Sequence, residues 1–322
     1  MAEKIRILVP GVIRGRVAER LQERFDIVRI DRADPSLLSP DDAASIRGAA
    51  VSGSFPATLF SALPALEIVG SFGVGYDGVD VAAAAAHGVV VTNTPDVLND
   101  EVADMTIGLL INTVRRLPEA EAYLRAGRWA REGAFPLSPL SLRGRKAGIY
   151  GLGRIGTAIA ERLKGFGIEV AYHTRRKREG VPYAYYPTLT ELAAAVDILI
   201  AIVPKTEETH KTVNAEVLRA LGANGVLINV GRGWTVDDEA LAAALKDGVI
   251  AAAGLDVFHD EPNVPEAFLS LPTLTMTPHV ASASVVTRDA MADLLASNIV
   301  SWFEEGRALT PVPETPVGER VR

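Results

Sequence analysis

Short apolar runs alternate with Ala- and Leu-rich stretches along most of this 322-residue chain. Near-continuous valine and isoleucine runs, such as Ile5–Val9, Ile68–Ser71 and Ile198–Ile202, are typical of strands that are covered on both faces. Stretches between such runs, including Thr157–Phe166 and Asp238–Lys246, have the pattern of crossover helices. The alternation therefore predicts an α/β fold with mostly parallel sheets.

The alternating pattern falls into two blocks, one ending near Thr94 and the other beginning near Lys146. Between them, Glu101–Tyr123 has the composition of one long helix, which we expect to cross between two domains. A later helical stretch, Arg288–Glu305, can return to the first block. The proline-rich segment after it, Thr310–Pro316, is expected to be frayed.

These boundaries predict a discontinuous domain and a continuous one, and the chain length also suits about two domains. The first domain is expected to comprise residues 1–98, completed by residues 288–322. The second domain is expected to comprise residues 99–287.

Composition excludes several kinds of site. The chain has no cysteine, which removes disulfides, thiolate nucleophiles and cysteine-ligated zinc, and we expect no metal ion. The net charge of -7 gives no overall basic field for nucleic acid or an anionic membrane. We see neither the apolar core of a signal peptide nor a run approaching the ~20 residues of a membrane span. A soluble, cytoplasmic protein is therefore expected.

The pattern G-x-G-x-x-G occurs twice, at Gly73–Gly78 and at Gly151–Gly156. The second occurrence follows an apolar run and opens a helical stretch, as in a dinucleotide-binding unit, whereas the alternative is a purely structural turn. Glycines in this context allow a tight turn and a close approach of the backbone to a pyrophosphate. We therefore predict cofactor contacts from the residues of this motif, which are Gly151, Leu152, Gly153, Arg154, Ile155 and Gly156.

The stretch that ends the next predicted strand favours NADP over NAD. An NAD site usually has an acidic residue here to bind the ribose hydroxyls, but this chain has Thr174, Arg175 and Arg176, with no carboxylate before Glu179. Hydroxyl and guanidinium groups can bind a 2′-phosphate through charge-assisted hydrogen bonds. A solvated basic loop is the alternative interpretation, and weaker use of NADH remains open.

Four further motifs are shared with a known family. They are Asn229–Gly233, Gly254–Phe258, Asp260–Pro262 and Thr277–His279. Together with Gly151–Gly156, in this order and spacing, they make nearly the whole chain resemble the D-isomer-specific 2-hydroxyacid dehydrogenases.

Within the family, Val91–Asp100 and His279–Ser282 most resemble the glyoxylate/hydroxypyruvate and hydroxyphenylpyruvate reductases. Ala281 stands where much of the family has glycine, which points to a subgroup.

The resemblance implies two Rossmann-like domains with a cleft between them. The smaller domain is formed by both chain ends, so Gly73–Gly78 belongs to it, and the backbone of Val74 and Gly75 is expected to bind the substrate carboxylate. Members of the family are commonly homodimers, and Glu101–Tyr123 is a candidate for part of such an interface.

The activity implied is the reduction of a small 2-oxo acid to the D-2-hydroxy acid by hydride transfer. Arg232 is expected to bind the carboxylate and polarise the carbonyl, although an arginine at a strand end is often only a surface ion pair. His279 is the expected general acid/base, with His259 as its competitor. Glu261 is expected to favour the imidazolium and fix the ring, the alternatives being Asp260 or a solvated turn.

By the same resemblance, Pro204 and Thr209 are expected to line the adenosine side of the cofactor site. Asp256 either contacts the nicotinamide amide or is a buried structural aspartate. The remaining predicted cofactor contacts are Val230 and Ala281.

The substrate side chain is not determined by these motifs. Several residues can either line its pocket or merely pack, namely Ser54, Phe55, Phe72, Trp129 and Phe135. A non-enzymatic NAD(P)-sensing protein of the same fold and another family enzyme, such as a phosphite or D-lactate dehydrogenase, remain as alternatives. Glu261 argues against the formate dehydrogenases, which resemble this chain but carry glutamine there.

Overall fold

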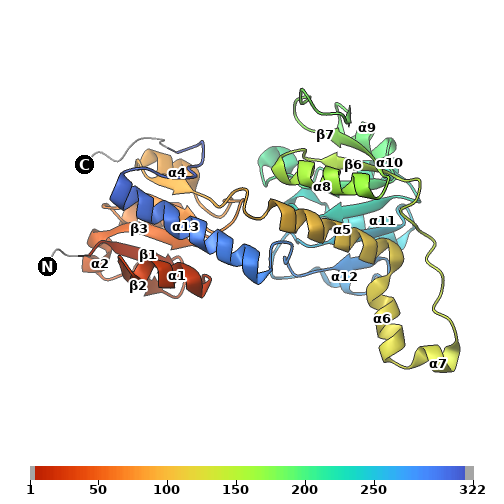
Figure 1. The fold of residues 1–322 in the computed structure, drawn as a ribbon, viewed down its shortest axis with the longest axis horizontal. Helices are drawn as coiled ribbons and strands as arrows, with labels where there is room; N and C mark the ends of the chain where they lie inside the picture. Colours follow the sequence, from red (N-terminus) through yellow and green to blue (C-terminus); the bar gives the residue numbers. More distant parts are fainter. Residues whose placement is uncertain (1–3, 316–322) are drawn as a thin grey trace. The chain divides into compact units, whose positions relative to one another are not determined.

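The computed structural model describes residues 4–315, which form two compact units (Figure 1). Unit 1 combines the chain up to Leu98 with the chain from Ser284, and unit 2 comprises Asn99–Ala283. The second boundary therefore lies before Ser284 rather than after residue 287, because α13 (Val285–Glu305) begins slightly earlier than its sequence pattern suggests. No helix within residues 4–315 combines the length and the apolar character needed to cross a membrane.

Unit 1 is built on a five-stranded sheet in the order β2-β1-β3-β4-β5, with every pair parallel. Its strands are β1 (Arg6–Pro10), β2 (Asp26–Ile30), β3 (Ile46–Val51), β4 (Ile68–Ser71) and β5 (Val90–Thr92), and its shorter helices are α1 (Gly15–Gln22), α2 (Pro40–Ser45), α3 (Ala57–Ala62) and α4 (Val81–Ala86). Ile7 and Val9 pack towards α1 and α13, whereas Leu8 packs with α3 on the opposite face. The sheet is thus covered on both sides, as the continuous apolar runs predicted.

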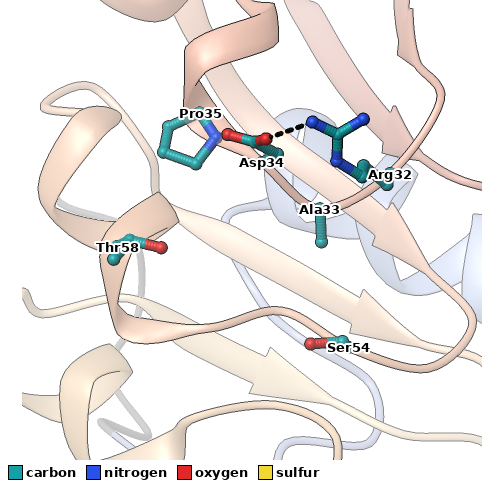
Figure 2. A pocket seen from close by; sticks show the side chains of 6 residues that line it. All are labelled: Arg32, Ala33, Asp34, Pro35, Ser54 and Thr58. Carbon is teal, nitrogen blue, oxygen red and sulfur yellow. Dashed lines mark hydrogen bonds and ion pairs between the residues drawn. The ribbon is translucent and has the colours of Figure 1, made fainter.

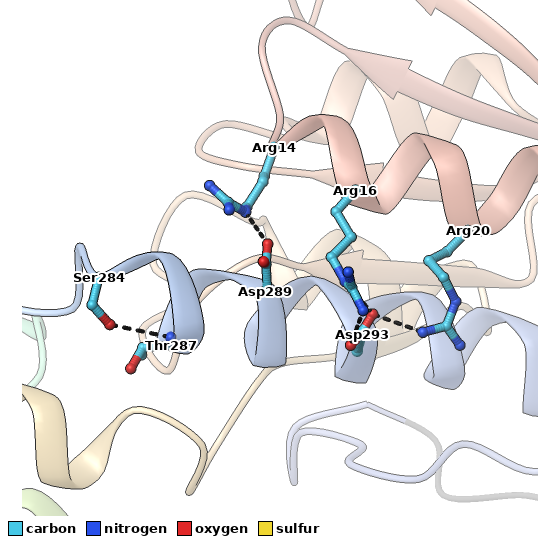
Figure 3. A network of polar contacts seen from close by, with 7 residues as sticks. All are labelled: Arg14, Arg16, Arg20, Ser284, Thr287, Asp289 and Asp293. Carbon is cyan, nitrogen blue, oxygen red and sulfur yellow. Dashed lines mark hydrogen bonds and ion pairs between the residues drawn. The ribbon is translucent and has the colours of Figure 1, made fainter.

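Ion pairs hold α13 against α1 within unit 1 (Figure 3). Arg14 Nε donates to Asp289 Oδ1 at 2.6 Å, and Asp293 accepts from Arg16 at 2.7 and 2.9 Å. Arg20 adds a third donor to Asp293 at 2.7 Å. The hydrogen bond from Arg16 lowers the pKa of Asp293, which favours the charged carboxylate that these ion pairs require.

The expectation that Thr310–Pro316 is frayed was wrong for Thr310–Thr315. Pro316 lies outside the residues that the structure describes. The N–H of Val312 donates to the carbonyl of Val91 at 2.9 Å, and the side chain of Val312 is 1% exposed. Thr315 Oγ1 in turn accepts from the N–H of Val91 at 3.1 Å. Pairing with β5 therefore compensates for the low intrinsic order of a proline-rich sequence.

Unit 2 is built on a seven-stranded parallel sheet in the order β12-β11-β10-β9-β6-β7-β8. Its strands are β6 (Lys146–Tyr150), β7 (Glu169–His173), β8 (Ala184–Tyr185), β9 (Ile198–Ala201), β10 (Val226–Asn229), β11 (Ala252–Leu255) and β12 (Leu274–Met276). Its helices are α5 (Asn99–Arg115), α6 (Leu117–Arg125), α7 (Arg128–Glu132), α8 (Arg154–Gly165), α9 (Leu189–Ala194), α10 (Ala215–Leu221), α11 (Asp238–Lys246) and α12 (Glu266–Leu269). Two parallel, doubly covered sheets confirm the predicted α/β class.

The single long helix expected over Glu101–Tyr123 is two helices, α5 and α6. The break falls at Arg116, whose φ of 54° is left-handed. Pro118 lies in the first turn of α6, where its missing N–H is tolerated, but inside a continuous helix it would remove a hydrogen bond. Figure 1 shows α6 and α7 extending away from the sheet of unit 2.

Candidate active site

Three ionisable side chains follow neighbouring strands of unit 2. Arg232 follows β10, Glu261 follows β11 and His279 follows β12, and these strands are adjacent in the sheet. The carboxyl ends of parallel strands lie at one edge of a sheet, where open α/β folds bind their ligands. The three predicted catalytic residues therefore share one edge of unit 2.

Glu261 and His279 form a direct pair. Nδ1 of His279 lies 2.6 Å from Oε2 of Glu261, and Oε1 of the same carboxylate accepts from the N–H of Phe258 at 3.0 Å. The carboxylate is thus held by the backbone on one side and holds the imidazole on the other. This arrangement leaves Nε2, on the far side of the ring, as the nitrogen that can exchange a proton with a bound molecule.

The backbone of His279 has an uncommon conformation, with φ of 51°. It is maintained by Asp256, whose side chain is fully buried and whose carbonyl accepts from the N–H of His279 at 2.8 Å. Asp256 Oδ1 accepts from the Thr277 hydroxyl at 2.6 Å and from the N–H of Val280 at 2.9 Å, and Oδ2 accepts from the N–H of Ala281 at 2.9 Å. These contacts give Asp256 a structural role in shaping the His279 loop.

The loop of Arg232 is shaped by Asn229, which is fully buried at the end of β10. Asn229 Nδ2 donates to the carbonyl of Arg232 at 2.9 Å, and its Oδ1 accepts from the N–H of Gly231 at 3.1 Å. The next residue, Gly233, lies so close to the loop after β11 that a Cβ there would be 1.9 Å from the carbonyl carbon of Phe258. Only glycine allows this contact, which ties the Arg232 loop to the loop that carries Glu261.

The alternatives to His279 and Glu261 lie in other contacts. His259 stacks on Trp234 with ring centroids 5.4 Å apart, and Asp260 accepts from the side chain of Asn263 at 3.2 Å. The remaining histidines are also engaged elsewhere: His87 caps α4, His173 contacts the carbonyl of Tyr186 and His210 stacks on Trp234.

The glycine motif after β6 fits a dinucleotide. Gly151 has φ of 105°, and a Cβ on Gly156 would lie 2.2 Å from the carbonyl oxygen of Gly151, so the turn is tight. A Cβ on Gly153, in contrast, would meet nothing within 4 Å. Gly153 also precedes α8 without a side-chain cap, which leaves the first N–H groups of that helix available for a phosphate.

The basic loop follows β7 and lies next to this motif. Arg175 and Arg176 are exposed, and the Thr174 hydroxyl donates to the carbonyl of Arg176 at 2.6 Å. Arg178 donates to the carbonyl of Leu152 and so ties the basic loop to the glycine turn. The guanidiniums of Arg175 and Arg176 thus remain at the surface.

The loop after β9 has its own internal support. The Thr209 hydroxyl donates to the carbonyl of Pro204 at 2.8 Å and accepts from the N–H of Thr206 at 2.9 Å. Val230 and Ala281, the other predicted cofactor contacts, are buried beside Arg232 and His279 in the sequence. Ile155 is half-buried in α8 and Arg154 is exposed.

The first glycine motif belongs to unit 1 and differs from the second. Its nearest helix, α4, begins only at Val81, and the carboxylate of Asp80 already accepts from the first turn, at 2.9 Å from Ala83 N. Asn93 Nδ2 donates to the carbonyl of Val74 at 2.9 Å and Thr94 Oγ1 accepts from the N–H of Gly73 at 3.0 Å. These contacts orient the Val74–Gly75 backbone without forming a phosphate cradle.

Comparison with known proteins decides the family. Residues 107–281 match the NAD binding domain of the D-isomer specific 2-hydroxyacid dehydrogenases. The chain is 43% identical to glyoxylate/hydroxypyruvate reductase A HPR2 of Arabidopsis thaliana, over 96% of this chain and 99% of the relative. It is 42% identical to the hydroxyphenylpyruvate reductase of Plectranthus scutellarioides, over 96% and 99%.

A solved structure is also similar. It is an NADPH-dependent glyoxylate/hydroxypyruvate reductase from Sinorhizobium meliloti in complex with NADP and malonate, with a TM-score of 0.97 and 63% identity over 99% of this chain and 100% of that one. The chain belongs to the D-isomer specific 2-hydroxyacid dehydrogenase family. The family resemblance drawn from the sequence motifs is therefore confirmed.

The candidates for the substrate pocket of this dehydrogenase differ in their surroundings. Phe55 is fully buried against Phe60 and serves the core of unit 1, and Phe135 packs edge-on against Tyr123 at 5.4 Å. Ser54 borders a shallow depression of unit 1, lined also by Arg32, Ala33, Asp34, Pro35 and Thr58 (Figure 2). Trp129 on α7 is 63% exposed.

Sequence reasoning missed Arg288, which it considered only as the start of a helix. Its guanidinium lies 5.7 Å from the ring of Phe72, directly before the Gly73 turn, and so adds a cation to this part of unit 1. It missed Trp234 as well, although a tryptophan two residues after Arg232 was a visible signal.

Asp256→Asn tests the support of the His279 loop. An amide would present an N–H₂ group to one of the three donors, so we expect the free energy of unfolding to fall by about 1–3 kcal/mol. We also expect a loss of dehydrogenase activity, since His279 would no longer be held in place. Urea unfolding and initial rates measure the two effects. Asp260→Asn, on an exposed neighbour, is the control and should change stability by less than about 0.5 kcal/mol; equal effects in both variants would contradict this role.

Proposed function

We propose that this dehydrogenase reduces a small 2-oxo acid, such as glyoxylate, hydroxypyruvate or hydroxyphenylpyruvate, to the D-2-hydroxy acid with NADPH. The observation that carries the proposal is the Glu261–His279 pair at 2.6 Å on the strand edge that also carries Arg232. The activities named for the relatives from Arabidopsis and Plectranthus and for the Sinorhizobium structure support this substrate class.

In this proposal, each group has one task. The guanidinium of Arg232 binds the carboxylate and polarises the carbonyl, whose oxygen becomes more negative as the carbon is reduced. Nε2 of His279 delivers a proton to that oxygen, and Glu261 stabilises the charged ring before transfer. The bound cofactor supplies the hydride that the carbonyl carbon receives. The N–H groups of Val74 and Gly75, in a turn held by Asn93 and Thr94, also bind the substrate carboxylate in this proposal.

The two units then have different tasks. Unit 1 binds substrate through the Gly73 turn, and unit 2 binds the dinucleotide through Gly151–Gly156. Thr174, Arg175 and Arg176 bind the 2′-phosphate, which favours NADPH over NADH. The adenosine lies against Pro204 and Thr209, and Val230 and Ala281 complete the nicotinamide side. The NADP in the Sinorhizobium structure supports this cofactor.

We further propose a homodimer formed through α6 and α7. Apolar side chains are exposed along these helices, with Leu117 at 44%, Leu124 at 55% and Trp129 at 63%. Exposed apolar groups gathered on one projecting segment are typical of an interface. Light scattering should give the mass of two chains, and Trp129→Glu should shift it towards one. A wild-type mass of one chain would refute the dimer.

Arg232→Ala and His279→Ala are the direct test of the activity. We expect each to lower kcat/KM for glyoxylate and hydroxypyruvate by at least about 100-fold, since each removes a group that acts on the carbonyl. NADPH binding should remain within about twofold of wild type, because the proposed dinucleotide contacts do not include the side chains of Arg232 and His279. Rates are read from NADPH absorbance and binding from fluorescence.

The control for these variants is His87→Ala, an exposed histidine of unit 1 that should retain full activity. Loss of NADPH binding in both active-site variants would mean that the site is misplaced. Absence of turnover of all three 2-oxo acids by the wild-type enzyme would refute the substrate class.

Arg175→Ser combined with Arg176→Ser tests the cofactor preference. Loss of charge-assisted hydrogen bonds to the 2′-phosphate should raise the dissociation constant of NADPH by about 10- to 100-fold and leave that of NADH nearly unchanged. Arg219→Ser with Lys246→Ser removes the same charge at the last turns of α10 and α11 and should affect neither cofactor. Equal weakening of NADPH and NADH by the first pair would contradict a phosphate contact.

A further inference from the structure

Trp234 occupies a position where three loops of unit 2 meet. It lies in a short 3-10 helix, Gly233–Thr235, immediately after Arg232 and Gly233. Its Nε1–H donates to the carbonyl of Thr206 at 2.8 Å, in the loop after β9. Its indole also contacts residues of the loops after β9 and β11, and no part of the proposed reaction uses it.

The indole contacts two imidazole rings. It stacks on His210, with centroids 3.9 Å apart and planes at 26°. It also stacks on His259, with centroids 5.4 Å apart and planes at 18°. The two imidazoles lie near each other as well, with centroids 6.0 Å apart, so the three rings form one cluster. Nζ of Lys205 lies 4.8 Å from the ring. The stack therefore joins the loop after β9, through His210, to the loop after β11, through His259.

The two residues that stack are close in sequence to the proposed reacting groups. Trp234 is two residues after Arg232, and His259 is two residues before Glu261. Between them, Gly233 packs directly against the backbone of Phe258, and the N–H of Phe258 holds the Glu261 carboxylate. A shift of His259 against Trp234 would therefore move Arg232 relative to the Glu261–His279 pair.

We propose that Trp234 is a positioning residue for Arg232. By stacking on His259, it fixes the loop of the substrate-binding guanidinium against the loop of Glu261. The inference rests on the proposed function of Arg232, which it deepens. His259 is exposed and Trp234 only half-buried, so the stack lies outside the hydrophobic core. Its loss is expected to affect the placement of Arg232 more than the stability of unit 2.

The experiment is a double-mutant cycle in the full-length enzyme with Trp234→Ala, His259→Ala and the pair combined. We expect each single variant to lower kcat/KM for glyoxylate by about 10-fold, because small misplacements of reacting groups have large effects on rate. The kcat/KM of the double variant should lie within about twofold of that of the single variants, because each single variant already loses the stack.

Conservative variants separate positioning from proton transfer. His259→Phe keeps a flat ring but cannot carry a proton, and Trp234→Phe keeps a ring but loses the N–H. We expect both to recover most of the activity lost in the alanine variants. If Trp234→Ala does not fold, His259→Ala and His259→Phe provide the same comparison. His87→Ala is the histidine control and should match wild type.

A second measurement does not depend on turnover. Calorimetric titration with oxalate in the presence of NADP⁺ reports how well Arg232 binds a small carboxylate. We expect oxalate to bind about 10-fold more weakly to His259→Ala and with wild-type affinity to His259→Phe, which would support the proposal. If the wild-type enzyme reduced none of the 2-oxo acids tested, only the substrate assignment would be refuted, and this binding result would still support the positioning role. Three results would overturn the proposal. They are wild-type affinity for oxalate in His259→Ala, a loss of kcat/KM in the double variant equal to the product of the two single losses, and no recovery in His259→Phe.

Discussion

The buried carboxylate of Asp256 is the constraint on which the geometry of the site depends. A carboxylate removed from water requires donors, and here they come from the Thr277 hydroxyl and the N–H groups of Val280 and Ala281. Satisfying Asp256 therefore folds the loop after β12 around it and holds His279 in a left-handed conformation. Because β11 and β12 pair in parallel, with Leu255 opposite Met276, the same register brings His279 to Glu261. The pairing of two strands thus determines the contact between the proposed acid and its carboxylate partner.

The sequence predicted those features that follow from local pattern and from parallel topology. Continuous apolar runs indicated covered parallel strands, and residues just after such strands were expected at one edge, which is where Arg232, Glu261 and His279 lie. The sequence could not predict the partners of Asp256, because they are a hydroxyl and two backbone N–H groups of another loop, and the conformation of that loop depends on Asp256 itself. For the same reason, Asp256 remained open between a cofactor contact and a structural role.

Other differences from the sequence-based expectations arise from long-range packing. The segment Thr310–Thr315 has a composition that favours disorder, yet it is ordered by pairing with β5, which is more than half of the chain away. The pattern over Glu101–Tyr123 predicted one helix, but the left-handed Arg116 ends α5 and Pro118 lies in the first turn of α6. The two-residue strand β8 carries too few residues for a periodic signal.

The composition of unit 1 from both chain ends also has a consequence for biosynthesis. The face of its sheet that receives α13 carries Ile7, Val9 and Gly70, against which Leu295 and Ile299 pack. These partners leave the ribosome only after the whole of unit 2 has been made. Until then, the part of this apolar face that α13 covers stays exposed in the nascent amino-terminal sheet, although α1 already covers the rest. Surfaces exposed at this stage are prone to aggregate. The synthesis of unit 1 thus begins first, but its fold can be completed only after that of unit 2, when α13 has been made.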